Sequence, residues 1–111
     1  MTPTWTDVCA EAQLTPNRGV AALLGDRQVA IFRVLPDDEL YAVDNLDPFS
    51  GAAVLSRGIV GSVGDTLTVA SPVFKQRFDL RTGACVDDPS ISIATYAARV
   101  RDGRVEVALQ P

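Results

Sequence analysis

The sequence contains no histidine and only two cysteines, Cys9 and Cys85. Without histidine, the chain alone cannot build a Ser-His-Asp or a Cys-His nucleophile system. A mixed Cys/His zinc site is excluded for the same reason. Two cysteines without histidine are also too few to hold an iron–sulfur cluster. Because the two cysteines lie far apart in the sequence, we expect two free thiols that act as small hydrophobic side chains.

Positive charge and long apolar runs are also scarce. The 111 residues include 10 Lys and Arg against 14 Asp and Glu, a net charge of −4. This argues against a nucleic-acid partner, because phosphate binding needs a basic face. No apolar run approaches the roughly 20 residues that span a bilayer, and the N-terminus lacks the pattern of a secretory signal. We therefore expect one domain over residues 1–111, cytoplasmic and without membrane contact.

Short β-prone runs separated by turn signals occupy most of the chain. Residues 10–14 allow one helical turn before Pro16. Asp102-Gly103 between two β-prone runs predicts a type I′ hairpin, and further turns are expected at 25–26 and 36–38. These features predict an all-β sandwich or small barrel. The expected strands cover residues 5–9, 19–24, 28–34, 40–43, 67–70, 76–80, 96–101 and 104–109, with another short strand near 59–60.

Two loop-rich segments, Asn45–Gly64 and Ser71–Arg77, do not fit a plain meander of strands. Long loops in compact domains are often functional. The first contains Asp47-Pro48-Phe49-Ser50-Gly51, the second contains Ser71-Pro72-Val73-Phe74-Lys75, and Phe78-Asp79-Leu80-Arg81-Thr82-Gly83 follows. This order and spacing resemble a Rieske-type [2Fe–2S] domain. That family has Cys-x-His in a first loop, Cys-x-x-His in a second, and then a Phe-Asp-Leu-x-Thr-Gly strand and turn. The resemblance implies a Rieske-like β-sandwich or small barrel of short antiparallel strands, with both loops at one end.

All four cluster-ligand positions of that family carry other residues in this sequence. Asp47 and Phe49 occupy the Cys-x-His positions, and Ser71 and Phe74 occupy the Cys-x-x-His positions. Phenylalanine has no donor atom, and a carboxylate and a hydroxyl are hard oxygen ligands that suit iron–sulfide poorly. We therefore expect no cofactor and no metal on this chain, and we predict no catalytic residue.

One branch of the family shares this departure. The two loop motifs and the general pattern from Trp5 to about Leu109 resemble the small subunits of assimilatory NAD(P)H-dependent nitrite reductases. The resemblance implies an accessory subunit without a redox centre. Its partner would be a large subunit that carries FAD, siroheme and a [4Fe–4S] centre and uses NAD(P)H to reduce nitrite to ammonium. The alternatives are a protein-binding module of another oxidoreductase and a Rieske-type electron carrier, which the missing ligands disfavour.

The substituted positions suggest specific roles. We expect Phe49 and Phe74 to pack together, or against nearby apolar residues, and so to fill the space of the lost cluster and tie the two loops to each other. The alternative is that one or both rings stay exposed and dock into the large subunit. Asp47 is expected to cap its own turn or to pair with Arg57 or Lys75.

Four residues supply the basic and polar part of the two loops in an otherwise acidic chain. They serve either as a docking surface for the partner, where charges at the rim set orientation and association rate, or as an ordinary solvated surface. These residues are Arg57, Lys75, Gln76 and Arg77.

Overall fold

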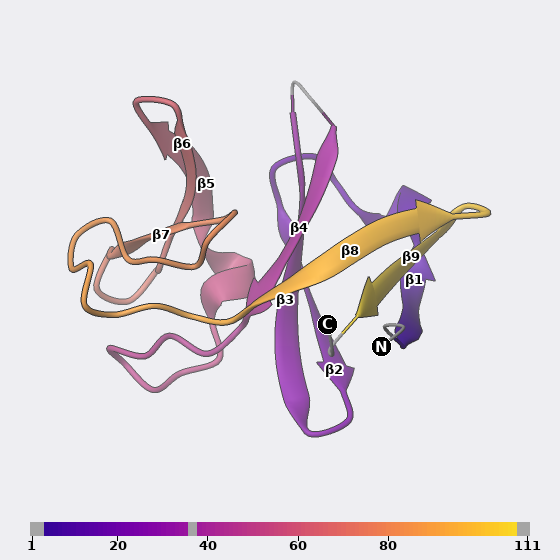
Figure 1. The fold of residues 1–111 in the computed structure, drawn as a ribbon, viewed down its shortest axis with the longest axis horizontal. Helices are drawn as coiled ribbons and strands as arrows, with labels where there is room; N and C mark the ends of the chain where they lie inside the picture. The colour runs from indigo at the N-terminus through magenta and orange to yellow at the C-terminus, as the bar shows by residue number, and fades with distance from the viewer. Residues whose placement is uncertain (1–3, 36–37, 109–111) are drawn as a thin grey trace.

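The computed structural model describes residues 4–35 and 38–108, and most of their regular structure is β-strand (Figure 1). Two single-turn 3₁₀ helices complete the regular elements, η1 over Glu11–Gln13 and η2 over Leu55–Arg57. The strands are β1 Trp5–Ala10, β2 Gly19–Leu24, β3 Arg27–Val34, β4 Glu39–Asp44, β5 Ile59–Val63, β6 Thr66–Ala70, β7 Arg77–Asp79, β8 Thr95–Arg101 and β9 Arg104–Ala108.

The strands form two antiparallel sheets that together make a nearly closed barrel. The larger sheet has the order β1-β9-β8-β4-β3-β2, and the smaller one has the order β5-β6-β7. In Figure 1 the smaller sheet and the long loops lie on the left, and β1 and β9 lie on the far right. The all-β prediction is confirmed. Among the described residues, no helix is long and apolar enough to span a membrane.

The turns follow the local sequence. Asp102 and Gly103 both have positive φ, 53° and 76°, as a type I′ hairpin requires. The strand expected near residues 59–60 extends over Ile59–Val63, so the first loop-rich segment ends earlier than its composition suggests. The turn expected at 36–38 and the strand end expected at 109 lie partly outside the described residues.

Strand β3 is buried on both faces and separates two hydrophobic cores. Its residues Ala30, Phe32 and Val34 point into the core shared with the smaller sheet, and Val29 and Ile31 point into the other core. The alternation follows from the two-residue period of a strand. The first core also contains Val43, Leu55, Val69, Phe78, Leu80, Cys85 and Ile93, and the second contains Leu14, Leu24, Ala42, Val105 and Val107. Both cysteines are free, as expected, although only Cys85 is fully buried.

Substitution of Gly83 tests how tightly the loop at residues 79–83 packs against the backbone of Ile93. The φ of Gly83 is +82°, and a Cβ there would overlap the carbonyl oxygen of Ile93. Gly25 has a φ of +65° but open space around it. We predict that Gly83→Ala lowers the free energy of unfolding by about 3 kcal/mol, from left-handed strain plus overpacking. Gly25→Ala should lower it by only about 1 kcal/mol. Urea denaturation of both variants measures the difference, and equal losses would show that the Ile93 backbone yields.

Candidate functional site

The two long loops meet through one buried hydrogen bond. The first loop joins β4 to β5, and the second joins β6 to β7. The hydroxyl of Ser71 donates to Oδ2 of Asp47 at 2.6 Å, and both residues are fully buried. These are the two positions at which the resemblance places cysteine ligands. A direct oxygen–oxygen hydrogen bond therefore joins the loops at these positions.

Three hydrogen-bond donors satisfy the buried carboxylate of Asp47. Besides Ser71, the backbone N–H of Phe49 donates to it at 2.9 Å and the Ser50 hydroxyl at 3.0 Å. Burial alone would raise the pKa of Asp47, but the hydrogen bonds from Ser71, Phe49 and Ser50 together hold the pKa below its usual value. Asp47 thus caps its own turn, one of the two predicted roles. The alternative ion pair with Arg57 or Lys75 does not occur among the described residues.

The same five-residue turn occurs three times at this end of the molecule. In the first loop, the N–H of Asp47 donates to Ala52 O at 2.8 Å, and the N–H of Gly51 donates to Asp47 O at 2.8 Å. The turns that begin at Ser71 and at Asp79 repeat both bonds with the same spacing. In each turn the first side chain accepts the N–H two residues later.

The fifth residue of each turn has a positive φ, at Gly51, Lys75 and Gly83. In the first and third turns, the sequence shows Asp followed four residues later by Gly. Lys75 in the second turn concealed the repeat, because a left-handed lysine is uncommon. Sequence analysis therefore missed that the three motifs share one backbone geometry.

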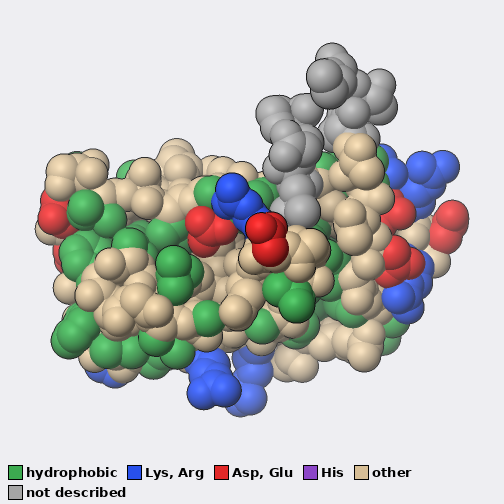
Figure 2. Space-filling model, turned by 90° about the horizontal axis from the view of Figure 1, so that it is seen from below, with side chains coloured by type: hydrophobic (Ala, Val, Ile, Leu, Met, Phe, Trp, Pro, Cys, Tyr) green, Lys and Arg blue, Asp and Glu red, His purple; other side chains and the backbone are tan. Residues whose placement is uncertain are grey.

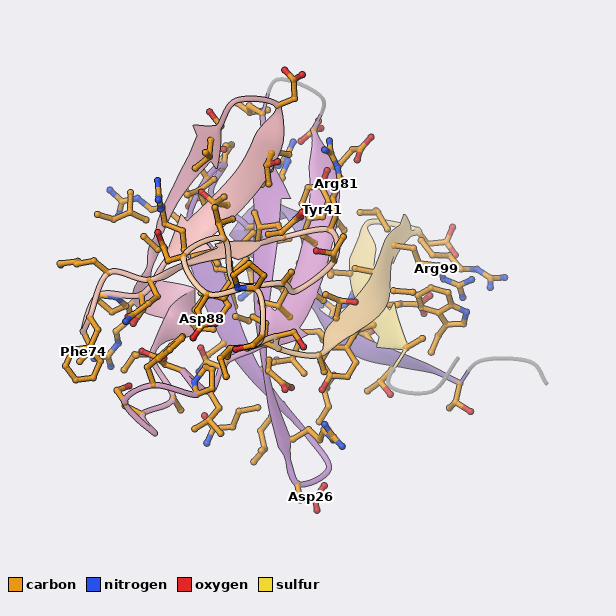
Figure 3. All side chains as sticks on the ribbon, turned by 60° about the vertical axis from the view of Figure 1, so that its left-hand side comes forward. Asp26, Tyr41, Phe74, Arg81, Asp88 and Arg99 are labelled. Atoms are coloured by element: carbon orange, nitrogen blue, oxygen red, sulfur yellow. The ribbon has the colours of Figure 1, made fainter. Side chains whose placement is uncertain are left out.

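The two phenylalanines have different environments: Phe49 packs against nearby apolar residues, as one form of the prediction has it, and Phe74 is exposed, as the alternative has it. Phe49 is half-buried and packs at a tilt on Phe78, with 6.1 Å between ring centroids. Phe74 is 57% exposed, and it points away from the molecule at the loop end (Figure 3). Phe49 is the third residue of its turn and Phe74 the fourth of its own, and Val73, the third residue of the second turn, is also exposed.

The structure separates the four candidate docking residues. Arg57 and Lys75 are exposed, and the Nζ of Lys75 donates to the Pro72 carbonyl at 3.1 Å. Arg77 is committed to Asp87: its guanidinium and its backbone N–H all donate to that carboxylate, the shortest contact being 2.7 Å. This contact holds the pKa of Asp87 below its usual value. Gln76 is half-buried, and its buried Oε1 has no partner among the described residues.

The residues at the four positions do not fit a [2Fe–2S] cluster. Phe49 and Phe74 offer no donor atom, and their rings lie in different environments. The oxygens of Asp47 and Ser71 are bonded to each other, and both are hard ligands. Within residues 4–35 and 38–108, no group of three or more His, Cys, Asp or Glu side chains could hold a metal ion.

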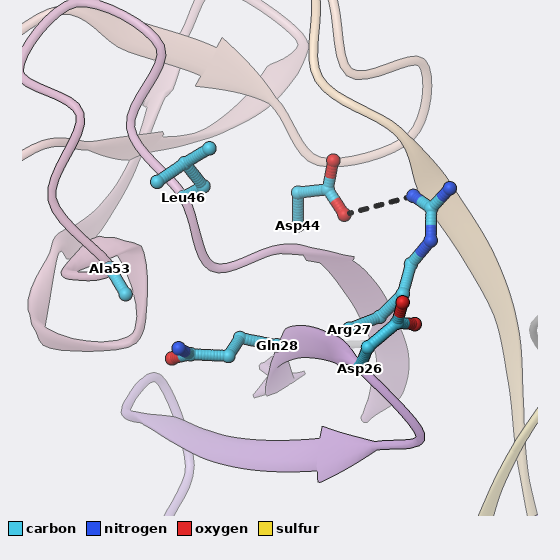
Figure 4. Close-up of a pocket in the computed structure, with 6 residues that line it drawn as sticks. All are labelled: Asp26, Arg27, Gln28, Asp44, Leu46 and Ala53. Carbon is cyan, nitrogen blue, oxygen red and sulfur yellow. Dashed lines mark ion pairs between the residues drawn. The ribbon is translucent and has the colours of Figure 1, made fainter.

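A pocket of about 410 Å³ lies beside the first loop (Figure 4). Two of its charged groups, Arg27 and Asp44, pair with each other. Arg27 lies 4.0 Å from Asp44 and donates to the Tyr96 hydroxyl at 3.1 Å, and that hydroxyl donates to Asp44 at 2.5 Å. These contacts connect β3, β4 and β8, so we interpret the polar groups of this pocket as structural. Its lining residues are Asp26, Arg27, Gln28, Asp44, Leu46 and Ala53.

Comparison with known proteins identifies the family. Residues 4–108 match the Rieske-like [2Fe-2S] domain. The nitrite reductase (NADH) small subunit of Escherichia coli K12 is 48% identical over 103 residues, which cover 93% of this chain and 95% of that protein. The chain belongs to the Rieske-like domain family, in the branch of the nitrite reductase (NADH) small subunits. The Rieske-like fold and the branch inferred from the loop motifs are thereby confirmed.

Solved structures agree with this membership. A crystal structure assigned to the NADH-dependent nitrite reductase small subunit of Mycobacterium tuberculosis is 50% identical, with a TM-score of 0.94 over 100% of this chain and 99% of that one. The ferredoxin of carbazole 1,9a-dioxygenase from Nocardioides aromaticivorans is 27% identical, with a TM-score of 0.83 over 96% of this chain and 99% of that one. The fold is thus shared between the small subunits and a ferredoxin.

A further relative contains the same domain inside a longer chain. A Klebsiella oxytoca protein, the nitrite reductase [NAD(P)H] large subunit, is 40% identical over 106 residues, which cover 96% of this chain and 11% of that protein. In that relative, a domain similar to this chain is part of the large-subunit polypeptide.

Asp47→Asn tests the hydrogen bond between the loops. We predict a loss of about 2 kcal/mol in the free energy of unfolding near pH 7, because charge-assisted hydrogen bonds become neutral ones. Asp79→Asn is the matched control. Asp79 caps an identical turn through backbone N–H groups alone, and its substitution should cost less than about 1 kcal/mol.

The loss at Asp47 should depend on pH. The folded pKa lies below the unfolded value of about 3.9, so the stabilisation is present above that value and is lost as pH falls through the folded pKa. Urea titrations between pH 3 and pH 7 should therefore show the wild-type advantage over Asp47→Asn shrinking at the acidic end. A pH-independent difference would contradict an ionised Asp47.

Proposed function

We propose that this chain is the accessory small subunit of a cytoplasmic NADH-dependent nitrite reductase in nitrate assimilation, and that it binds and supports the catalytic large subunit. In this proposal the large subunit carries FAD, siroheme and a [4Fe–4S] centre and reduces nitrite to ammonium. The identity of 48% over nearly the whole length of a nitrite reductase small subunit carries the proposal. The Klebsiella large subunit that contains a similar domain supports the choice of partner.

The subunit acts without a cluster of its own. The hydrogen bond between Asp47 and Ser71 supports this part of the proposal, because it joins the loops where the ferredoxin-like members of the family would need two thiolates. The loops then serve as a rigid scaffold instead of a redox site.

The end of the molecule formed by the loops is the surface that docks on the large subunit. Val73 and Phe74 are 44% and 57% exposed there, and exposed Arg57 and Lys75 lie on the same two loops. In Figure 2 hydrophobic side chains gather at the left end of the face, which is the loop end. An exposed aromatic ring with charged residues on the same loops is a candidate interface anchor, because aromatic residues are enriched among the side chains that carry binding energy.

Expression of the large subunit with and without this chain tests the proposed function. We expect the two chains to co-purify, and we expect nitrite-dependent NADH oxidation or siroheme content to fall when the small chain is left out. The absorption spectrum of the purified small chain should lack visible bands of an iron–sulfur cluster. Such bands would overturn the cluster-free role, and a large subunit that neither binds this chain nor responds to its absence would overturn the accessory role.

Phe74→Ala tests the docking surface directly. We predict that it weakens binding to the large subunit by about tenfold or more, since truncation of an aromatic anchor costs about 2 kcal/mol. Its free energy of unfolding should stay within about 0.5 kcal/mol of wild type, as for other surface substitutions. Leu23→Ala, which removes a 69% exposed side chain on β2, is the control and should bind normally. Isothermal titration calorimetry gives both affinities, and equal affinities would place the interface elsewhere.

A further inference from the structure

Strands β4 and β8 are neighbours in the larger sheet but pair over only two residue pairs, Ala42 with Tyr96 and Val43 with Thr95. Beyond these pairs the strands diverge: β4 continues along β3, and β8 continues along β9. Figure 1 shows the two strands spreading apart toward the top and right of the molecule. The sheet is therefore split over the first half of β4 and the second half of β8.

The backbone groups that face this opening follow from the hydrogen-bond pattern. On β4, Asn45 N–H donates to Gln28 on the β3 side, and Asp44 N–H donates to Ala94 on the β8 side, both at 2.9 Å. Because alternate residues of a strand direct their N–H and C=O groups to opposite sides, Leu40 presents both groups to the β8 side.

The same reasoning applies to β8. Its hairpin with β9 has a two-residue turn, and Arg101 pairs with Arg104 next to that turn. Odd-numbered residues of β8 therefore bond to β9, and Ala98 presents its N–H and C=O to the opening. No loop hydrogen bond of the described residues reaches the backbone of Leu40 or Ala98.

The opening between β4 and β8 forms a hollow on the surface of the molecule. It has a volume of about 430 Å³ and is lined by β4, by β8 and by Leu80 and Arg81 from the third turn. The side chains of Leu40 and Ala98 pack against the second core. Figure 3 shows Tyr41 and Arg81 close together on its other side. The Arg81 guanidinium lies against the Tyr41 hydroxyl, which donates to Glu39 at 2.8 Å, so the polar groups on this side are already paired.

We propose that an extended segment of the large subunit inserts between β4 and β8 and completes the sheet at Leu40 and Ala98. Two facing edges with free backbone groups select an extended main chain. Leu40 and Ala98 pack against the second core, so the side of the segment that faces this core would carry small apolar side chains. This inference rests on the proposed function, which supplies the partner, and the similar domain inside the Klebsiella large subunit supports that choice.

Residue-resolved hydrogen exchange on the complex tests the insertion. The amides of Leu40 and Ala98 should exchange at least about tenfold more slowly in the complex with the large subunit than in the free chain, because they gain partners. The amides of Ala97 and Arg99, which face β9, are internal controls and should change little. A complex in which Leu40 and Ala98 are unaffected would overturn the insertion and leave the proposed function intact. If no complex forms, the proposed function fails and the insertion fails with it.

A proline variant gives an independent test of the same edge. Ala98→Pro removes the N–H that faces the opening and leaves the bonds to β9 in place, so affinity for the large subunit should fall about tenfold or more. Val100→Pro, also directed away from β9 but outside the lining of the opening, is the matched control and should bind normally. Equal affinities would overturn the insertion. Slow exchange at Leu40 that grows with the concentration of the free chain would assign the opening to a second copy, and would also overturn it.

Discussion

The hydrogen bond from Ser71 to Asp47 is the contact on which the loop end of this molecule depends. It joins the two loops beyond the β5–β6 pairing that connects their ends, and both of its residues are fully buried. A buried carboxylate is costly unless its lone pairs are filled, and here two hydroxyls and one backbone N–H fill them. The contact thus fixes both loops relative to each other.

The repeated turn explains why oxygen-bearing side chains can stand at the two positions where the family has cysteine. Each of the three turns needs an acceptor at its first position to bind the N–H two residues later. Carboxylate and hydroxyl oxygens meet that requirement, as a thiolate sulfur can. Asp47 and Ser71 therefore meet the requirement of their turns with side-chain oxygens. Once the ligands are gone, the aromatic residues at the other two positions are free to serve packing, as Phe49 does, or exposure, as Phe74 does.

The two proposed contact regions lie on different parts of the fold and use different physics. The loop end offers side chains on a rigid support, so its contribution would come from a desolvated aromatic ring. The opening between β4 and β8 offers main-chain groups, so its contribution would come from completing a hydrogen-bond ladder. An accessory subunit held by both would be fixed in orientation as well as in position.

The sequence by itself determined the strands, the type I′ hairpin at Asp102-Gly103 and the absence of cluster ligands, because these follow from local composition and from residue chemistry. It also located Asp47, Phe49, Ser71 and Phe74 as a set, through the resemblance of the two loops to the ligand motifs of the Rieske family. Tertiary structure alone decided that Asp47 bonds Ser71, that Arg77 is committed to Asp87, and that Phe49 is covered while Phe74 is not. These outcomes depend on which side chains far apart in the chain come within a few ångströms of each other, and no local pattern encodes that distance.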